Sequence, residues 1–439
     1  MGDEEERQAN IVAEAQSDTS TEDSVDEQPL RIETLSATEL VSVATYFQDE
    51  EDYIVFSLIN KKCLHVLDLF TFNPISETQL FPNVKVQHYY SEQDYVLDGV
   101  DSFVICYPVA LNKAVRFKEN KVVCTQVIYT KEDVAMFGVH IPRSLSIALI
   151  GASCFEKNYS VDVMILPATV KSIEQAAFSQ CKNLESVACG TSLTSLRDEC
   201  FSGCELLEQI GFPVEGLRAI GDDCFSECHS LRKIQFPRTL IAIGDGAFYE
   251  CVELTSLSFP PSVDFIGPGC FEKCSQLQRV TLPNNISAIT SDCFRACSLL
   301  NDIQFPSSLL SVGDNAFEDC VSLKRLDLNS IRKVGVGAFK RCSSLTEVVM
   351  TTHLMRCKIE CFLGCASLKS VEVPSTLTAL PKYFMSECVK LSEVVLPETV
   401  VKIGDYCFEL CKSLTKVNIP RDIESFGVGC FSGCTALNQ

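Results

Sequence analysis

Apolar and polar positions follow one recurring pattern along most of this chain. A Phe lies three or four residues before a Cys and a Leu lies three residues after it, twelve times between Cys181 and Cys434. With the Cys at position zero, apolar residues recur at +3, +6, +8, +12 and +15, Pro is usual at +9, and the period is 23 residues. An earlier copy contains Phe155, with Asn158 in the Cys position. Because so short a unit cannot bury its own apolar side chains, it must stack on copies of itself.

Each repeat predicts two short strands. The segment from +3 to +8, as in SLKSVEVP, has the spacing of a leucine-rich repeat and should pair in parallel with its copy in the next coil. Pro at +9 ends this strand because it has no N–H to donate. The apolar pair at +12 and +15, as in Val400 and Ile403, predicts a second strand.

The turns of the repeat carry their own signals. The stretch from Phe to Cys predicts a single helical or 3₁₀ turn. The predicted fold class is an α/β repeat, a curved right-handed leucine-rich repeat solenoid of about 13 coils of 23 residues with a parallel sheet on its inner face. Gly four residues before Phe predicts a tight turn with positive φ in eight coils: Gly151, Gly221, Gly244, Gly267, Gly313, Gly335, Gly404 and Gly427.

The chain before the repeats differs from them in pattern. Residues 1–30 are rich in Glu, Asp, Ser and Thr and predict a disordered acidic tail. Residues 31–145 predict a small α+β domain that caps the first coil, and the repeats follow at 146–439. Leu35, Leu40, Phe47 and Leu58 lie in a pattern that predicts two short helices within 34–63. The segments FPNVKVQHYY, SFVICYPV and VVCTQVIY predict short strands.

The chain contains 25 cysteines, and most of them lie in the repeat register. Twelve hold position zero and eight precede the repeated Phe, where other coils have Ala, which indicates a small buried position. With Cys189 and Cys357, 22 of the 25 fall at core positions. The start MGDEEERQAN has no basic stretch followed by an apolar one, so no secretory signal is expected. We therefore predict a cytoplasmic protein with reduced cysteines.

Charge narrows the classes of partner. The formal net charge of −21 repels phosphate backbones and anionic lipid surfaces, so nucleic acid is not an expected partner. No apolar run approaches the ~18 residues of a membrane-spanning helix, so no membrane insertion is expected. The remaining expected partner is a protein.

No pattern of catalytic or ligand-binding residues emerges. The five His form no metal-binding motif, and Cys pairs such as Cys200 and Cys204 are spread one pair per coil instead of converging on a metal. Pairs such as Gly244 and Gly246 recur in one turn and lack the Lys of a phosphate-binding loop. We therefore predict no enzyme activity, no catalytic residues, no cofactor and no metal.

The side chains at +4, +5 and +7 should point outward from the first strand. Basic residues recur there on alternate coils of an otherwise acidic protein, and a concave basic strip would dock an acidic partner segment. The alternative is a solvated strand ladder with charges of both signs. The candidate partner-binding residues are Arg232, Lys233, Gln235, Gln278, Arg279, Lys324 and Arg325. At the other end of the repeats, Ile423, Phe426, Phe431 and Leu437 are expected to form an open apolar edge, so that the final coil either frays or self-associates tail to tail.

The segment LPETVVKIGDYCFELCKSLTKVNIP resembles the BspA-like (Treponema pallidum-type) leucine-rich repeat family, and the resemblance covers about 290 of 439 residues. The preceding segments FNPISETQLFPNV and VIYTKEDVAMFGVHIP resemble the N-terminal domain of intracellular BspA-like proteins of anaerobic parasitic protists. The resemblance implies a protein-binding scaffold. Bacterial members are surface adhesins that bind host matrix proteins, which implies an adhesin as an alternative.

The segment LSATELVSVATYFQDEEDYIVFSLINKKC resembles an F-box, although the usual Pro after the first Leu is missing. This resemblance implies a substrate-receptor adaptor of a cullin-type ubiquitin ligase whose repeats select the substrate. The alternative is a helical cap. The residues that carry the resemblance are Leu35, Leu40, Val43, Tyr46, Phe47, Asp52, Asn60, Lys61, Lys62 and Cys63.

Overall fold

The computed structural model describes residues 35–120, 122–142 and 146–437. The acidic tail predicted at 1–30 lies outside the described residues. The chain forms two compact units, Met1–His88 with Leu97–Asp101, and Tyr89–Val96 with Ser102–Gln439. Each unit has its own hydrophobic core.

The first unit is built from short helices. Three α-helices occur where two were predicted: α2 (Ala37–Ala44), α3 (Glu50–Ile59) and α4 (Lys61–Val66). The third arises because Asn60, in an extended conformation, ends α3 and caps α4 by accepting the Cys63 N–H at 2.9 Å. Two 3₁₀ helices follow, η2 (Leu67–Leu69) and η3 (Thr78–Leu80). The core of this unit contains Leu40, Ala44, Tyr53, Phe56, Cys63, Val66, Leu67, Phe70, Ile75 and Phe81.

The strands predicted before the repeats are confirmed. They are β1 (Val86–Tyr89), β2 (Ser102–Ile105), β3 (Val109–Ala110), β4 (Val123–Cys124) and β5 (Val127–Tyr129). Two helices that were not predicted, α5 (Leu111–Glu119) and α6 (Lys131–Phe137), lie among them.

The boundary predicted at residue 145 stays a prediction, but the compact units divide the chain earlier. Residues from Ser102 onward belong to the unit of the repeats. The reason is continuous packing: β3 and β5 extend the parallel sheet that continues through β6 (Ile147–Ile150). The Tyr129 ring also stacks on Phe155 at 6.0 Å between centroids.

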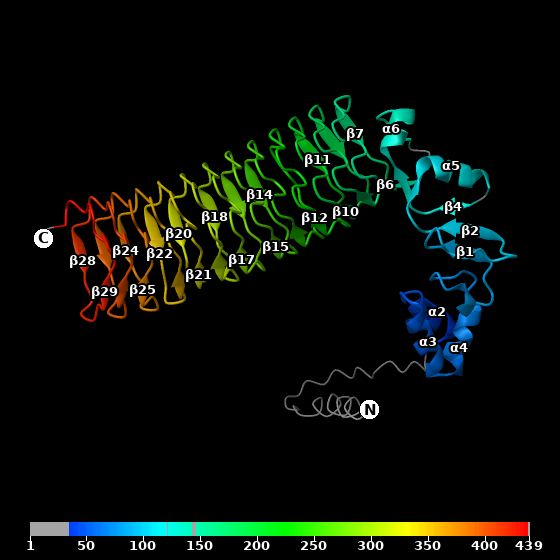
Figure 1. The fold of residues 1–439 in the computed structure, drawn as a ribbon, viewed down its shortest axis with the longest axis horizontal. Coiled ribbons are helices and arrows are strands. Elements are labelled where there is room, and N and C mark those ends of the chain that lie inside the picture. Colours follow the sequence, from blue (N-terminus) through cyan, green and yellow to red (C-terminus); the bar gives the residue numbers. More distant parts are fainter. Residues whose placement is uncertain (1–34, 121, 143–145, 438–439) are drawn as a thin grey trace. The chain divides into compact units, whose positions relative to one another are not determined.

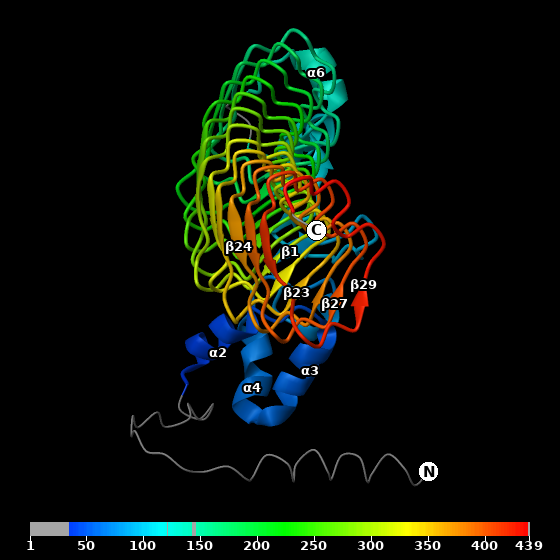
Figure 2. The same cartoon turned by 90° about the vertical axis from the view of Figure 1, so that its left-hand side faces the viewer.

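The repeats form a parallel β-solenoid of about 14 turns with about 23 residues per turn, which confirms the predicted fold. Two rows of strands run along it (Figure 1), and Figure 2 shows corresponding strands stacked behind one another. Pairing is parallel and one repeat apart, as in Leu257 with Val280. Within the described residues 146–437 no helix occurs, so the α-helices of the fold precede the repeats.

We call the two rows the long-strand row and the short-strand row. The long-strand row consists of β7 (Val163–Ile165), β9 (Ser186–Ala188), β11 (Gln209–Gly211), β14 (Ser256–Ser258), β16 (Arg279–Thr281), β18 (Asp302–Gln304), β20 (Arg325–Asp327), β22 (Glu347–Val349), β24 (Ser370–Glu372), β26 (Glu393–Val395) and β28 (Lys416–Asn418). The short-strand row continues from β6 through β8 (Ser172–Ile173), β10 (Ser195–Leu196), β12 (Ala219–Ile220), β13 (Ala242–Ile243), β15 (Phe265–Ile266), β17 (Ala288–Ile289), β19 (Ser311–Val312), β21 (Lys333–Val334), β23 (Arg356–Cys357), β25 (Ala379–Leu380), β27 (Lys402–Ile403) and β29 (Ser425–Phe426).

The repeated Phe side chains form a stack through the core. Phe271 is fully buried, and its ring lies nearly parallel to Phe248 and Phe294 at centroid distances of 5.3 and 5.6 Å. Near the C-terminal coils the stack is interrupted. There Met385 takes the Phe position, and Phe384 lies edge-on to the preceding Phe362, with an interplanar angle of 86°.

The Cys at position zero has a hydrogen bond as well as a packing role. Cys274 donates its S–H to the backbone oxygen of Phe248 in the preceding coil, with an S to O distance of 3.3 Å. All twelve zero-position thiols make the equivalent bond, at 3.0 to 3.4 Å. A thiol is small, apolar and a weak donor, so it fits this position. All 25 cysteines are free in the structure.

The interpretation of the Gly four residues before Phe was wrong. None of these eight glycines has positive φ. They are glycines because consecutive coils approach closely: a Cβ on Gly313 would lie 2.6 Å from the backbone of Thr290 and Ser291, and one on Gly404 would lie 2.6 Å from Pro381 and Lys382. No side chain fits at that distance.

Positive φ occurs at two other positions of each turn, two residues before the Phe and one residue before the Cys. In one coil these residues are Gly269 and Lys273, with φ of 61° and 62°. A single turn between Phe and Cys is present as predicted, because the Cys274 N–H bonds to Phe271 O at 3.3 Å. It does not continue as a helix, since the left-handed Lys273 sends its N–H to Arg295 of the next coil.

Candidate interaction surface

The long-strand row presents alternate side chains to solvent. In β16, Val280 is 2% exposed, whereas Arg279 and Thr281 on either side of it are exposed. All seven candidate partner-binding residues are exposed at the positions predicted for them. The coil that contains Arg232, Lys233 and Gln235 has no long strand, so the long-strand row passes from β11 to β14 without a member in this coil.

The predicted basic strip is partly neutralised. Each of its arginines pairs with a carboxylate of the following coil: Arg232 with Glu253 at 2.8 Å, Arg279 with Asp302 at 2.6 Å, and Arg325 with Glu347 at 3.6 Å. These pairs are exposed to solvent, so they contribute little to stability. Their effect is on the surface, since an Arg held by a neighbouring carboxylate is less available to a partner. The long-strand row is therefore a ladder of mixed sign at these coils.

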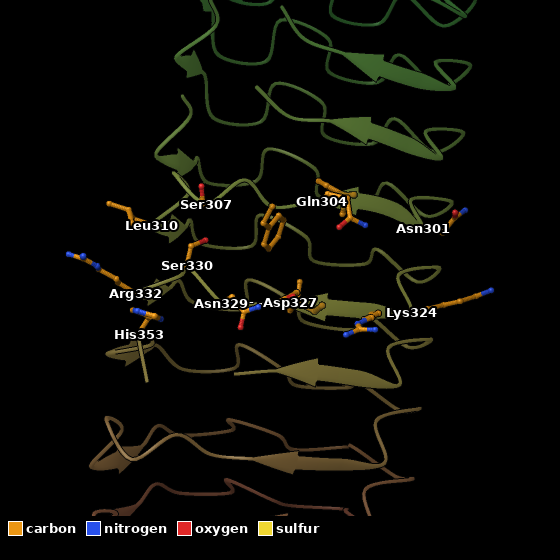
Figure 3. A pocket seen from close by; sticks show the side chains of 14 residues that line it. Asn301, Gln304, Ser307, Leu310, Lys324, Asp327, Asn329, Ser330, Arg332 and His353 are labelled. Carbon is orange, nitrogen blue, oxygen red and sulfur yellow. Dashed lines mark hydrogen bonds between the residues drawn. The ribbon is translucent and has the colours of Figure 1, made fainter. Parts of the chain in front are cut away.

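A groove on the same face was not predicted. It has a volume of about 810 Å³ and is lined by residues 301–310 of one coil, 324–332 of the next, and His353. Figure 3 shows Lys324 on one side of it and Leu310, Arg332 and His353 on the other, with Ser307, Asn329 and Ser330 between. Two of the predicted residues, Lys324 and Arg325, line this groove.

The strand ladder is interrupted at the groove. β16 pairs with β18 and β20 pairs with β22, but β18 and β20 share no ladder. Asn301 N–H bonds to Gln278 O in the coil before, and Thr346 N–H bonds to Lys324 O in the coil after, at 3.1 and 2.9 Å. No such bond joins Lys324 to Asn301, although this stretch is fully described. The two coils are therefore separated at their strands.

The turn side of the same coils carries a charge network. The Glu318 side chain is only 7% exposed; it accepts a hydrogen bond from Arg341 at 2.8 Å and forms an ion pair with Arg295 at 3.0 Å. Lys340 lies 3.7 Å away and also pairs with Glu360 at 2.8 Å. The buried carboxylate thus has cationic partners from the coils on both sides, and the network links four consecutive coils.

The thiols of the core are unsuited to catalysis. Burial raises the pKa of Cys181 to about 11 and the pKa values of Cys293 and Cys411 to about 12. A thiol with so high a pKa has almost no thiolate, which is the nucleophile and metal ligand. No group of three or more His, Cys, Asp or Glu that could hold a metal ion occurs in the described part of the chain. Among the described residues no helix is long and apolar enough to cross a membrane.

The repeat pattern identifies the family to which this chain belongs. The sequence pattern described as BspA type leucine rich repeat region matches residues 148–277, 207–324, 265–388 and 332–439, more than half of the chain. The chain belongs to the BspA-type leucine-rich repeat family. Its relatives are leucine-rich repeat proteins, a family without enzymatic function. No curated protein matches the sequence.

Solved structures of leucine-rich repeat proteins are similar to this chain. A leucine-rich repeat protein from Bacteroides ovatus is 28% identical, with a TM-score of 0.59, over 66% of this chain and 81% of that one. A leucine rich cell surface protein from Faecalibacterium prausnitzii is 24% identical, with a TM-score of 0.40, over 62% and 83% of the two chains. A leucine-rich repeat protein from T. pallidum is 22% identical, with a TM-score of 0.22, over 66% and 83%.

Proposed function

We propose that this chain is a non-enzymatic scaffold that binds a partner protein through the outward side chains of its long-strand row. One observation carries the proposal: the interior repeats from coil to coil, whereas the exposed positions vary. The outward pairs of successive strands are Ser256 and Ser258 in β14, Arg279 and Thr281 in β16, and Asp302 and Gln304 in β18. A constant frame with variable outward side chains suits recognition of another protein.

We place the scaffold in the cytoplasm. The support is the cysteine content: 25 thiols, all free in the structure, suit a compartment that keeps thiols reduced. Burial raises the pKa of most repeat thiols and keeps them unreactive. A surface adhesin would instead have to persist in an oxidising environment.

Cross-linking tests the scaffold proposal. The full-length protein, incubated with extract of its native source, is treated with an amine-reactive cross-linker and analysed by mass spectrometry. Links to the partner should concentrate on lysines at positions +4 and +5, on the face of the long-strand row (Lys233, Lys324, Lys369 and Lys416), and not on lysines of the turn side (Lys157, Lys182, Lys273 and Lys340). Links confined to the turn side would contradict the proposal, and a host matrix protein as the partner would favour the adhesin.

A matched pair of variants sharpens this test. Ser258→Arg with Thr281→Arg enlarges two outward positions of β14 and β16. Ser230→Arg with Gln276→Arg makes the same change in charge at position +2 of two coils, which lies outside every strand. The first pair should abolish the cross-links and the second should retain them. Equal effects of the two pairs would remove the long-strand row as the binding face.

The helices of the first unit support a second candidate, a ubiquitin-ligase adaptor. Helix α3 is apolar on both sides: Tyr53 and Phe56 are buried, while Val55, Leu58 and Ile59 are exposed, with Leu58 at 78%. An exposed apolar patch of this kind is typical of a protein-binding site. It is the feature that an F-box-like segment would need.

Co-precipitation with a cullin tests the adaptor. The unmodified protein should co-precipitate a cullin from extract of its native source, and Leu58→Asp should abolish this association. Leu69→Asp is the matched control, because Leu69 is also an exposed leucine of this unit, at 51%, and lies outside α3. Absence of a cullin with the unmodified protein would exclude the adaptor and leave the scaffold.

A further inference from the structure

One missing residue shapes the groove. Cys320 and Cys342 are 22 residues apart, one fewer than the usual 23. The loss falls between the two strand rows, where Phe305-Pro306-Ser307-Ser308-Leu309 of the preceding coil corresponds to Leu328-Asn329-Ser330-Ile331. The shorter loop also lacks the Pro that ends the strand in most other coils. The groove therefore lies where a full-length loop would otherwise pack on its neighbour.

The floor of the groove is apolar and accessible. Ile303 and Phe305 are only half-buried. The residues in the same positions of the neighbouring coils, Val280 and Leu326 for Ile303 and Leu282 and Leu328 for Phe305, are at most 7% exposed. Opening of the ladder between β18 and β20 thus exposes two side chains that the repeat pattern assigns to the core. Such a floor can bury an apolar side chain of a ligand.

The rim of the groove is cationic. The lining of the groove contains Lys324, Arg325 and Arg332 but only one carboxylate, Asp327, in a chain of net charge −21. Arg325 and Lys358 have carboxylate partners, Glu347 and Asp314. In contrast, no carboxylate within the described residues lies at ion-pair distance from Lys324 or Arg332. These two cations can therefore pair with charges on a ligand.

We propose that this groove binds an extended acidic peptide segment of a partner protein. Figure 3 shows Lys324 and Arg332 pointing outward on opposite sides of the groove, where each would meet a carboxylate. An apolar side chain between the two carboxylates would lie on Ile303 and Phe305. The side chains of Asn301, Gln304 and Asn329 supply hydrogen bonds to the peptide backbone.

A protein segment fits the groove better than a nucleic acid. A polynucleotide would extend past the cationic coils onto the acidic remainder of the chain, where it is repelled. A short peptide stays within the cationic coils. The proposal rests on the proposed scaffold function and specifies where the partner docks and what chemistry it offers.

The experiment measures binding of a labelled peptide by fluorescence anisotropy. The probe is a short synthetic peptide of Glu and Asp with one central Leu, and the protein is the full chain. Lys324→Glu with Arg332→Glu should weaken binding by about tenfold or more, because two ion pairs become two repulsions. Both side chains are exposed, so these substitutions leave the fold intact.

Two controls isolate the groove. Lys171→Glu with Lys369→Glu makes the same kind of charge reversal at exposed Lys of the corresponding positions in distant coils and should leave the affinity within about twofold. Inserting a Pro between Leu328 and Asn329 restores the 23-residue coil while keeping every charge, and it should abolish binding by closing the groove. A circular dichroism melt checks that the insertion variant folds.

Three results would overturn the proposal: no binding of the peptide, equal losses for the two charge-reversal pairs, or equal binding of a single-stranded oligonucleotide of the same charge. The scaffold is judged separately by cross-linking to the native partner. Retention of those cross-links in the Lys324→Glu with Arg332→Glu variant would place the partner elsewhere on the repeats. If neither the unmodified protein nor any variant formed cross-links to a partner, the scaffold proposal itself would be refuted.

Discussion

The regular coils between Cys251 and Cys297 and the irregular coils between Cys297 and Cys342 share one interior and differ in their outer loops. Phe317 and Phe339 stack at 5.4 Å with an angle of 6°, as closely as Phe248 and Phe271 in the regular coils. The thiol bond is also kept, with Cys342 Sγ 3.3 Å from Phe317 O. On the outside, one loop is a residue shorter and the strand ladder is open. The core thus tolerates variation of the loops, and that is where a binding site can form.

The largest expected effect concerns the shared interior as a whole. Burial raises the pKa of Cys181 to about 11 and that of Cys411 to about 12, whereas an unfolded thiol has a pKa of about 8.5. The stability that these thiols contribute is full below pH about 8.5 and is lost as the pH rises toward their folded values. Each thiol contributes a loss of about 1.4 kcal/mol per pH unit in that window, and the losses add over many coils.

Urea denaturation at a series of alkaline pH values measures this loss. The midpoint should fall steeply between pH about 8.5 and 10.5. A variant with Ala at Cys274, Cys297 and Cys320 should show a shallower slope, which separates the thiols from Lys and Tyr that also titrate there. A midpoint independent of pH would contradict burial of the thiols.

Next in size is the loss of one ring from the stack. Phe271→Ala removes a fully buried side chain that stacks on both neighbours and should cost about 3 to 5 kcal/mol. Phe265→Ala is the matched control, since Phe265 lies in the same coil on β15 and is 47% exposed. Urea denaturation should show a large shift of the midpoint for Phe271 and a small one for Phe265. Equal shifts would mean that Phe271 is not a core residue.

The charge network of the irregular coils should have an intermediate effect. Glu318→Gln removes the charge of a buried carboxylate that Arg295 and Arg341 share, which should cost about 1 to 3 kcal/mol. Glu253→Gln changes an exposed pair with Arg232 and should leave the thermal midpoint unchanged. The network would be irrelevant to stability if both variants melted like the unmodified protein.

An effect of similar size is expected where the Phe stack is interrupted. Met385→Phe alone should destabilise by about 1 to 3 kcal/mol, because Phe384 already fills the adjacent small position. Phe384→Cys combined with Met385→Phe restores the usual Cys-Phe pair and should recover most of that loss. Thermal melts of the three proteins check this order, and a double variant less stable than Met385→Phe would contradict it.

The 23-residue period made the buried residues predictable from the sequence, whereas the pairing of surface residues and the groove could be established only from the structure. Phe271 and Cys274 were assigned to the core because residues that recur every 23 residues can be buried only against their copies in the adjacent coils. The role of Gly313 could not be determined from the sequence, because both a positive φ and a close approach of two backbones require a glycine. The pairing of Arg279 with Asp302 depends on the direction of side chains in adjacent coils. The groove could not be predicted because it depends on the missing strand pairing between β18 and β20. The 22-residue spacing from Cys320 to Cys342 was its one signal in the sequence.

Differential alkylation tests the central claim, a shared buried interior beneath a variable surface, most directly. Native protein is labelled with one isotope of iodoacetamide, then denatured and labelled with another, and the peptides are analysed by mass spectrometry. The zero-position cysteines from Cys181 to Cys411 should carry only the second label, while the partly exposed Cys106 and Cys124 take up the first label sooner. All 25 cysteines should carry one label or the other. First-label modification of Cys274 and its equivalents, or about ten or more cysteines locked in disulfides, would contradict the account.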